Sequence, residues 1–401
     1  MKRILMVSYF APPLLSAESI LVAKTLPYLA EYFKIDLITV GPDPEYKRDE
    51  QLLHHMQHEN LRIFRYRNPK FSNKILRRLY EKGIRKIVDV NIAWMRNVLA
   101  QHHGNVNLAD YSLIYSRSQP GTSHLVALEF KRQLGIPWVA QFSDPWAHNP
   151  YHSSNRVDER HEERVIHAAD RYVFPTVEMC DLVAAHYRSL NIGERSKVIP
   201  HCYDASLYYS RTSKENGITL AYIGDFYGIR SPEPLLKALS IIQEKEPILL
   251  QNVRVRVIGN VESKFRALID TYKDRVSVPI DLVGQVPYLQ SLEKMAESDI
   301  LLLIDAPSDV NLFLPSKLID YFGARKPILG ITSTKGTAGQ LVGAFGFPVI
   351  DPLDAEGVAN GLMKMIKELP SYQEKARNNV YDRFSAQEVA REFRDLFASL
   401  F

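Results

Sequence analysis

The chain has 401 residues, of which 46% are apolar and 24% are charged, and its 50 Lys and Arg against 46 Asp and Glu give a net charge of +4. These proportions are typical of a globular protein and exclude collagen-like, low-complexity and intrinsically disordered chains. Cys180 and Cys202 are the only cysteines, which excludes a disulfide framework and a cysteine-rich zinc site. We therefore expect two domains and a cytoplasmic location.

The first half of the chain alternates short apolar runs with helical patterns. The run Ile4–Ser8 predicts a buried strand rather than the core of a signal peptide, because a helical pattern over Ser19–Phe33 follows at once. Pro27 lies inside that pattern and is expected to kink or restart the helix. Further strands are predicted at Ile35–Val40, Leu61–Phe64, Leu113–Tyr115, Trp138–Phe142, Arg171–Phe174 and Lys197–Ile199.

The second half repeats this alternation after a polar stretch at residues 201–217. Strands are predicted at Thr219–Ile223, Val253–Ile258, Ile280–Val283, Ile300–Ile304, Pro327–Gly330 and Pro348–Ile350. Helices are predicted at Pro232–Glu244, Ser263–Lys273, Leu289–Ala296, Pro315–Ala324, Gly336–Gly343 and Asp354–Glu368.

This alternation favours an α/β fold with two doubly wound, Rossmann-like domains. We expect one domain at residues 1–205, completed by an amphipathic C-terminal helix at 385–401, and the other at residues 206–384. Ligands of doubly wound sheets bind beyond the carboxyl ends of the strands, so the cleft between two facing domains is the expected active site.

A glycine-containing loop follows the predicted strand Thr219–Ile223. Gly224 and Gly228 allow close approach of the backbone to a ligand, and Arg230 adds a cation with bidentate geometry. Ser231 and Pro232 are expected to cap and open the next helix, whose N-terminus attracts phosphate. The segment predicts a diphosphate site, and a tight turn followed by a surface arginine is the alternative.

A second helix start occurs at Pro315. Ser316 and Asp320 lie one helical turn apart on one face, and Lys317 can reach a phosphate. A carboxylate at this position can accept both hydroxyls of a ribose. The alternatives are helix capping for Ser316, a solvated charge for Lys317 and a dipole-favoured acid for Asp320.

In the first half, Asp144 follows the predicted strand Trp138–Phe142. A carboxylate at this end of a strand can orient or deprotonate an acceptor hydroxyl, and Trp146 can form a wall on which a sugar stacks. Arg117 and His124 are further candidates for the acceptor side. For Asp144 the alternative is a turn cap, and for His124 it is a surface or capping group.

We predict no metal site. His54, His55 and His58 have helical metal spacing but lack acidic partners, and Asp305 and Asp309 merely bracket a loop after a strand. The segment that begins at His161 has Val165 where a zinc-binding helix requires a second histidine.

Two segments, "YIGDFYGIRSPEPLLKAL" and "LPSKLIDYFGARKPIL", resemble the nucleotide-sugar signatures of family 4 glycosyltransferases, which have the GT-B fold. "ILMVSYFAPP", "GIPWVAQFSDPW" and "KVIPHCYD" are similar to family landmarks in the same order, so the resemblance runs nearly end to end. It is closest to the bacterial members that build surface polysaccharides.

The resemblance assigns roles to individual residues. It implies that Arg230 binds the donor diphosphate, that Lys317 and Ser316 face the phosphates, and that Asp320 holds the ribose as the distal acid of an E-x7-E pair. Leu312 stands where that family has the proximal acid. The full set of expected donor-binding residues is Gly224, Tyr227, Gly228, Arg230, Ser316, Lys317, Leu318 and Asp320. The expected catalytic residues are Asp144, Arg230 and Lys317.

Basic residues are concentrated between residues 62 and 96, opposed only by Glu81 and Asp89. They are Arg62, Arg65, Arg67, Lys70, Lys74, Arg77, Arg78, Lys82, Arg85, Lys86 and Arg96. A basic amphipathic helix between Asn73 and Leu99 would suit an anionic membrane surface. The alternative is a core-packed helix with a solvated face. Nucleic acid is a third option, but no recognition motif accompanies the charge, and we predict no nucleic-acid partner.

We therefore expect a glycosyltransferase that uses a nucleotide diphosphate sugar as co-substrate and binds no permanent cofactor. Its acceptor is expected to be a glycan or a lipid-linked glycan in bacterial cell-surface polysaccharide synthesis, and the resemblance implies retention of anomeric configuration. A peripheral position on the inner face of the cytoplasmic membrane would follow from the basic stretch. The alternatives are a sugar-nucleotide epimerase of GT-B shape and a non-catalytic homologue that acts as a binding or membrane-associated module.

Overall fold

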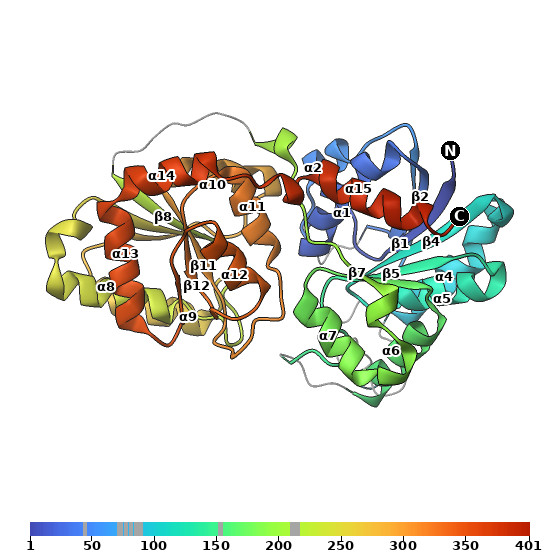
Figure 1. Cartoon of the computed structure of the whole chain (residues 1–401), viewed down its shortest axis with the longest axis horizontal. Coiled ribbons are helices and arrows are strands. Elements are labelled where there is room, and N and C mark those ends of the chain that lie inside the picture. The colour runs from blue at the N-terminus through green and yellow to red at the C-terminus, as the bar shows by residue number, and fades with distance from the viewer. Residues whose placement is uncertain are drawn as a thin grey trace. The chain divides into compact units, whose positions relative to one another are not determined.

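The computed structural model of the chain describes residues 1–42, 46–69, 75, 79, 83, 91–150, 155–208 and 217–401. The chain divides into two compact units (Figure 1). Unit 1 comprises Met1–His201 and Ala386–Phe401, and unit 2 comprises Cys202–Ser385. The division therefore lies a few residues before the boundary expected at residues 205 and 206.

Unit 1 is built on a seven-stranded sheet in the order β3-β2-β1-β4-β5-β6-β7, and every neighbouring pair is parallel. The order reverses between β1 and β4, which is the topological switch point of a doubly wound sheet. The strands are β1 (Arg3–Ser8), β2 (Lys34–Val40), β3 (Leu61–Tyr66), β4 (Tyr111–Ser118), β5 (Trp138–Phe142), β6 (Arg171–Phe174) and β7 (Ser196–Val198).

Helices flank both sides of this sheet (Figure 1). They are α1 (Ala17–Ala30), α2 (Glu50–His55), α4 (Ile92–Gln101), α5 (Thr122–Leu134), α6 (Arg156–Ala168), α7 (Val177–His186) and α15 (Ala386–Ala398). The Ser16 hydroxyl caps α1 by accepting a hydrogen bond from the Ser19 backbone N–H at 3.1 Å. The expected restart at Pro27 is wrong: α1 continues to Ala30, because the proline lies near its end and buried Leu26 and Leu29 hold that end against the core.

The C-terminal helix α15 packs on α1 within unit 1. The ring of Phe397 lies 5.8 Å from that of Phe33, and the ring of Phe393 lies 5.5 Å from that of Tyr115 on β4. Both α15 side chains are almost completely buried. Unit 1 therefore closes its core with residues from the other end of the chain.

Unit 2 is built on a six-stranded parallel sheet in the order β10-β9-β8-β11-β12-β13, with its switch point between β8 and β11. The strands are β8 (Ile218–Ile223), β9 (Val253–Ile258), β10 (Ile280–Leu282), β11 (Ile300–Ile304), β12 (Ile328–Ile331) and β13 (Val349–Ile350). The helices are α8 (Glu233–Lys245), α9 (Ser263–Lys273), α10 (Tyr288–Glu297), α11 (Ser316–Ala324), α12 (Thr337–Ala344), α13 (Ala355–Lys367) and α14 (Leu369–Asn378).

Several details differ from the sequence expectations. Helix α8 begins at Glu233 and not at Pro232, although the Ser231 hydroxyl still accepts a hydrogen bond from the Glu233 N–H at 3.1 Å. Helix α14 was not expected, and its Pro370 lies in the first turn, where proline is tolerated. Short 3₁₀ turns occur at His102–Gly104, Leu108–Asp110, Arg188–Leu190, Gly193–Arg195, Ala205–Leu207, Pro247–Leu250 and Asp382–Phe384.

The basic stretch at 62–96 falls largely outside the described residues, which omit Lys70, Lys74, Arg77, Arg78, Lys82, Arg85 and Lys86. Among the described members, Arg62 binds the completely buried Asp36, with its Nε 2.7 Å from Oδ1. Burial acts to raise the pKa of Asp36, but hydrogen bonds from Arg62 and Tyr111 outweigh it and lower the pKa below its usual value. Arg62 is therefore occupied by an internal ion pair.

We expect the C-terminal helix to contribute strongly to the stability of unit 1. Phe397→Ala should lower the free energy of unfolding by about 3–5 kcal/mol, because it removes a completely buried ring. Phe401 also faces Phe33, with ring centroids 6.0 Å apart, but is 46% exposed, so Phe401→Ala should cost less than about 1.5 kcal/mol. Urea unfolding followed by tryptophan fluorescence measures both, and equal losses would contradict this packing.

Candidate functional site

The carboxyl edge of the unit 2 sheet gathers residues from three segments. The loop after β8 carries Gly224 and Arg230, β11 is followed directly by Asp305, and α11 begins with Ser316 and Lys317. Because all strands of this sheet are parallel, the loops that follow β8 and β11 leave it at the same edge.

The loop after β8 is held close to the end of β9. The Gly224 N–H donates to the Ile258 carbonyl at 2.8 Å, and the Asp225 carboxylate accepts a hydrogen bond from the Asn260 N–H at 2.7 Å. Gly224 has a φ of 139°, and a Cβ there would lie 3.4 Å from the Lys317 Nζ. Glycine thus permits both this backbone conformation and the close approach to Lys317.

Lys317 is partly buried and lies against Tyr222. Its Nζ donates to the Tyr222 hydroxyl at 3.0 Å and lies 4.2 Å from the centre of the Tyr222 ring. Burial and the neighbouring Arg230 guanidinium lower the pKa of Lys317 to about 7, against the opposite effect of Asp305 and Asp225. Near neutral pH, Lys317 therefore populates both its charged and its neutral form.

Arg230 is partly exposed and lies between an aromatic ring and a carboxylate. Its guanidinium carbon is 5.5 Å from the centre of the Tyr227 ring, and its Nη2 is 3.5 Å from the Asp305 Oδ1. Tyr227 and Gly228 are themselves exposed. Arg230 and Lys317, with the N-terminus of α11, provide positive charge suited to an anion that carries more than one negative charge.

Asp320 lies one turn into α11 and is only 4% exposed. Its Oδ1 accepts a hydrogen bond from the Tyr288 hydroxyl at 2.9 Å, and the Tyr208 hydroxyl donates to its backbone carbonyl at 3.0 Å. An ionised carboxylate has about four acceptor positions, so the Tyr288 bond does not by itself exclude a ligand hydroxyl. Sequence reasoning did not identify Tyr288.

The structure does not present Leu318 to a ligand. Its side chain is completely buried, and its backbone N–H donates to the Pro315 carbonyl at 2.9 Å. Ser316, at the first position of the helix, is partly exposed. The N–H groups of a first helical turn lack partners within the helix, so Ser316 and Lys317 are better placed than Leu318 to offer theirs to an anion.

In unit 1, a buried ion pair lies where β4 and β5 end and α1 begins. The Arg117 Nε is 2.6 Å from the Glu18 Oε1, and the Ser143 hydroxyl donates to the Glu18 Oε2 at 2.7 Å. Arg117 is 2% exposed. It is therefore held inside the fold and does not present its guanidinium at the surface, in contrast to the expected acceptor contact. Sequence reasoning missed Glu18, which lies 99 residues from its partner.

Asp144 follows Ser143 directly and is partly exposed, as is Trp146. Gly121 makes room for the Trp146 ring, because a Cβ at this glycine would lie 2.2 Å from the indole. The hydrogen bond from the Ser143 hydroxyl to Glu18 anchors the residue that directly precedes Asp144.

His124 is a core histidine in this structure, neither a surface group nor an accessible acceptor contact. It is completely buried, its ring centre lies 4.5 Å from that of Phe142, and its Nδ1 lies 2.8 Å from the Ser116 hydroxyl. Burial lowers the pKa of His124 to about 3, which keeps the ring neutral. These contacts give it a packing role beside the Asp144 turn.

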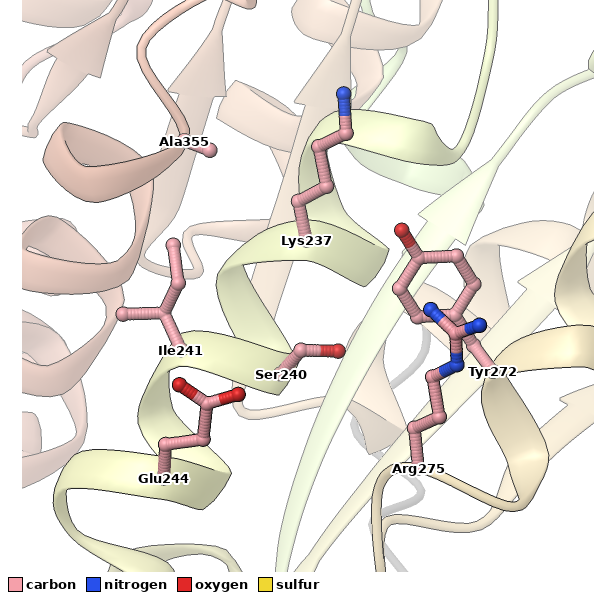
Figure 2. Close-up of a pocket in the computed structure, with 7 residues that line it drawn as sticks. All are labelled: Lys237, Ser240, Ile241, Glu244, Tyr272, Arg275 and Ala355. Carbon is pink, nitrogen blue, oxygen red and sulfur yellow. The ribbon is translucent and has the colours of Figure 1, made fainter.

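A surface hollow of about 390 Å³ lies elsewhere in unit 2 (Figure 2). It is bordered by α8, the end of α9 and the start of α13, and none of the candidate residues lines it. The lining residues are Lys237, Ser240, Ile241, Glu244, Tyr272, Arg275 and Ala355. Its Arg275 provides a useful control cation for experiments on Arg230.

The described part of the chain contains no cluster of three or more His, Cys, Asp or Glu side chains placed to hold a metal ion. None of the helices formed by the described residues combines the length and apolar character needed to cross a bilayer.

No model of a known protein family matches the sequence, and no curated protein matches it either. Solved structures, however, match over its whole length. Anabaena HepE in complex with UDP-glucose has a TM-score of 0.70 and 15% identity, with 100% of both chains covered. Sucrose-phosphate synthase from Thermosynechococcus elongatus has a TM-score of 0.72 and 15% identity, with 100% of this chain and 99% of that chain covered.

The chain has the GT-B fold. WaaG, a glycosyltransferase involved in lipopolysaccharide biosynthesis, matches it with a TM-score of 0.64 and 16% identity over 98% of this chain and 99% of that chain. The expected α/β architecture of two doubly wound parallel sheets is thereby confirmed.

We expect Lys317 to titrate far below ordinary lysines. In protein labelled with ¹³C-lysine, one Cε resonance should shift with a midpoint near pH 7, because burial and Arg230 disfavour the charged form. Unperturbed lysines titrate near pH ~10.4. The resonance should vanish in Lys317→Met. If every lysine resonance of the folded protein titrates above about pH 9, the described environment of Lys317 is wrong.

Proposed function

We propose that this chain is a glycosyltransferase that moves a sugar from a nucleoside diphosphate sugar to a hydroxyl of an acceptor. The observation that carries the proposal is that two basic side chains, Arg230 and Lys317, lie close together beside the N-terminus of α11. They are at the carboxyl edge of the unit 2 sheet. Anabaena HepE, to which this chain is similar in fold, forms complexes with UDP and with UDP-glucose. The donor diphosphate is the ligand that this charge arrangement suits.

In the proposed complex, the diphosphate contacts Arg230, Lys317 and the N–H groups of Ser316 and Lys317. Gly224 and Gly228 allow the loop backbone to approach, and Tyr227 borders Arg230. Asp320 accepts hydroxyls of the ribose, while Tyr288 fixes the orientation of its carboxylate. Unit 2 is thus the donor-binding domain.

In the proposed reaction, the bond from the anomeric carbon of the sugar to the diphosphate oxygen breaks, and a bond to the acceptor oxygen forms. The leaving diphosphate gains negative charge, which Arg230 and Lys317 stabilise in their partly buried setting. The acceptor hydroxyl gives its proton to the carboxylate of Asp144 in unit 1, which also orients the hydroxyl. The family resemblance supports retention of the anomeric configuration.

We place the acceptor among glycans and lipid-linked glycans of bacterial surface polysaccharide synthesis, with the enzyme in the cytoplasm and peripheral at the membrane. The sequence resemblance and the likeness in fold to WaaG support this placement. The basic stretch 62–96 adds support, since Ile75 and Leu79 within it are 70% and 64% exposed. Exposed apolar residues among basic residues suit an anionic lipid surface.

The first experiment is a thermal shift screen with UDP, GDP, CDP and ADP and their sugar conjugates. Stabilisation by one nucleotide class would support the donor site and identify the base, since ligand at 100 times its Kd adds about 2.7 kcal/mol. Product analysis then separates the functions: sugar transfer supports the proposal, an isomerised sugar nucleotide indicates an epimerase, and binding without turnover indicates a non-catalytic homologue.

Arg230→Met should weaken binding of the stabilising nucleoside diphosphate by at least about tenfold, because a charge-assisted contact contributes about 1.5–3 kcal/mol. Arg275→Met is the matched control: it removes the same charge from the hollow of Figure 2 and should change the affinity less than about twofold. Isothermal titration calorimetry measures both. Equal weakening in the two variants would refute a specific diphosphate contact at Arg230.

Asp144→Asn should lower the rate of sugar transfer by about 10²-fold or more, as expected for loss of a general base, and leave donor affinity unchanged. Asp181→Asn, on the exposed face of α7, removes the same charge in unit 1 and should retain full activity. Transfer rates at saturating donor test this. Near wild-type transfer by Asp144→Asn would remove Asp144 from the mechanism.

A further inference from the structure

Asp305 occupies an unusual position for an acid in an anion-binding site. It follows β11 directly, is 5% exposed, and its Oδ1 lies 3.5 Å from the Nη2 of Arg230. A carboxylate therefore sits beside the very guanidinium that the proposed donor diphosphate requires.

Asp305 is anchored from its other side. Its Oδ2 accepts hydrogen bonds from the Asn311 Nδ2 and from the Thr332 hydroxyl, each at 3.1 Å. Asn311 is itself held, because its N–H donates to the Lys335 carbonyl at 3.1 Å and its Oδ1 accepts from the Phe313 N–H at 3.0 Å. These bonds hold the carboxylate in place through its Oδ2, and the Oδ1 is the oxygen that faces Arg230.

The contact between Arg230 and Asp305 is an ion pair without a good hydrogen bond. Strong charge-assisted bonds measure about 2.7–2.9 Å, and the Asp305 Oδ1 is a buried oxygen that has no hydrogen-bond partner among the described residues. The other nearby acid, Asp225, accepts hydrogen bonds from Asn260. A diphosphate oxygen can therefore offer Arg230 a shorter and stronger bond than Asp305 does.

We propose that Asp305 is an internal counter-ion that Arg230 exchanges for the donor diphosphate, and that its competition for Arg230 speeds release of the nucleoside diphosphate product. The inference rests on the proposed function. A diphosphate oxygen that takes the Arg230 Nη2 replaces Asp305 there, and the carboxylate recovers this contact as the ligand leaves. Asp305 thus limits the affinity for the nucleoside diphosphate product, although Asp305 itself does not contact that product.

The test removes the charge of Asp305 and keeps its shape. Asp305→Asn should bind UDP at least about fivefold more tightly than wild type, mainly through slower dissociation. The affinity for uridine, which has no phosphate, should stay unchanged. Stopped-flow kinetics and calorimetry measure these quantities, and a thermal melt checks the fold. Asp305→Ser is the second variant and should also tighten UDP binding, in case the asparagine disturbs the bonds from Asn311 and Thr332.

Two controls isolate the ion pair. Asp309→Asn removes the same charge from an exposed position on the same loop and should change UDP affinity less than about twofold. In an Arg230→Met background, Asp305→Asn should not tighten UDP binding, because the competition requires the arginine.

The outcomes separate this inference from the proposed function. Unchanged or weaker UDP binding by both folded Asp305 variants would overturn the counter-ion role, even where Arg230→Met shows that the donor site is correct. Persistence of the tightening without Arg230 would overturn it as well. If wild type binds no nucleoside diphosphate at all, the donor site and the counter-ion role fall together.

Discussion

Parallel strand pairing is the constraint on which the rest of this structure depends. Parallel neighbours cannot be joined by a hairpin, so after each strand the chain must return along a face of the sheet before the next strand begins. Every segment that leaves the carboxyl end of a strand therefore emerges at one edge. In unit 2 this brings Arg230, from the loop after β8, close to Asp305 and Lys317, which lie between the end of β11 and the first turn of α11. In unit 1 it brings Glu18, Arg117 and Ser143 together.

Most strands were predictable because both of their faces are buried, which gives apolar runs such as the uninterrupted Ile300–Ile304. Strand β4 was predicted only as Leu113–Tyr115, because its last residues are polar and their burial depends on partners elsewhere. Arg230 and Lys317 were recognisable from a glycine loop and a helix start. Asp305 was seen only as an acid after a strand, since no local pattern shows which cation it faces.

Two ionisable residues whose pKa is lowered by burial have different roles in this structure. Burial lowers the pKa of both His124 and Lys317, and both residues were candidates from the sequence. His124 is enclosed by Phe142 and its neighbours, so a neutral ring is its stable state. Lys317 lies at the edge of its sheet beside two acids and an arginine, so an incoming anion can restore its charge. Only the tertiary environment distinguishes these cases.

The packing of α15 on α1 makes unit 2 an insertion within the sequence of unit 1. As the polypeptide leaves the ribosome, the strands of the unit 1 sheet emerge first, but the aromatic cover that Phe393 and Phe397 supply is synthesised only after unit 2. Unit 2, whose residues are contiguous, can complete its own sheet in the interval. Vectorial synthesis therefore favours a nascent chain in which the second unit matures before the first is sealed.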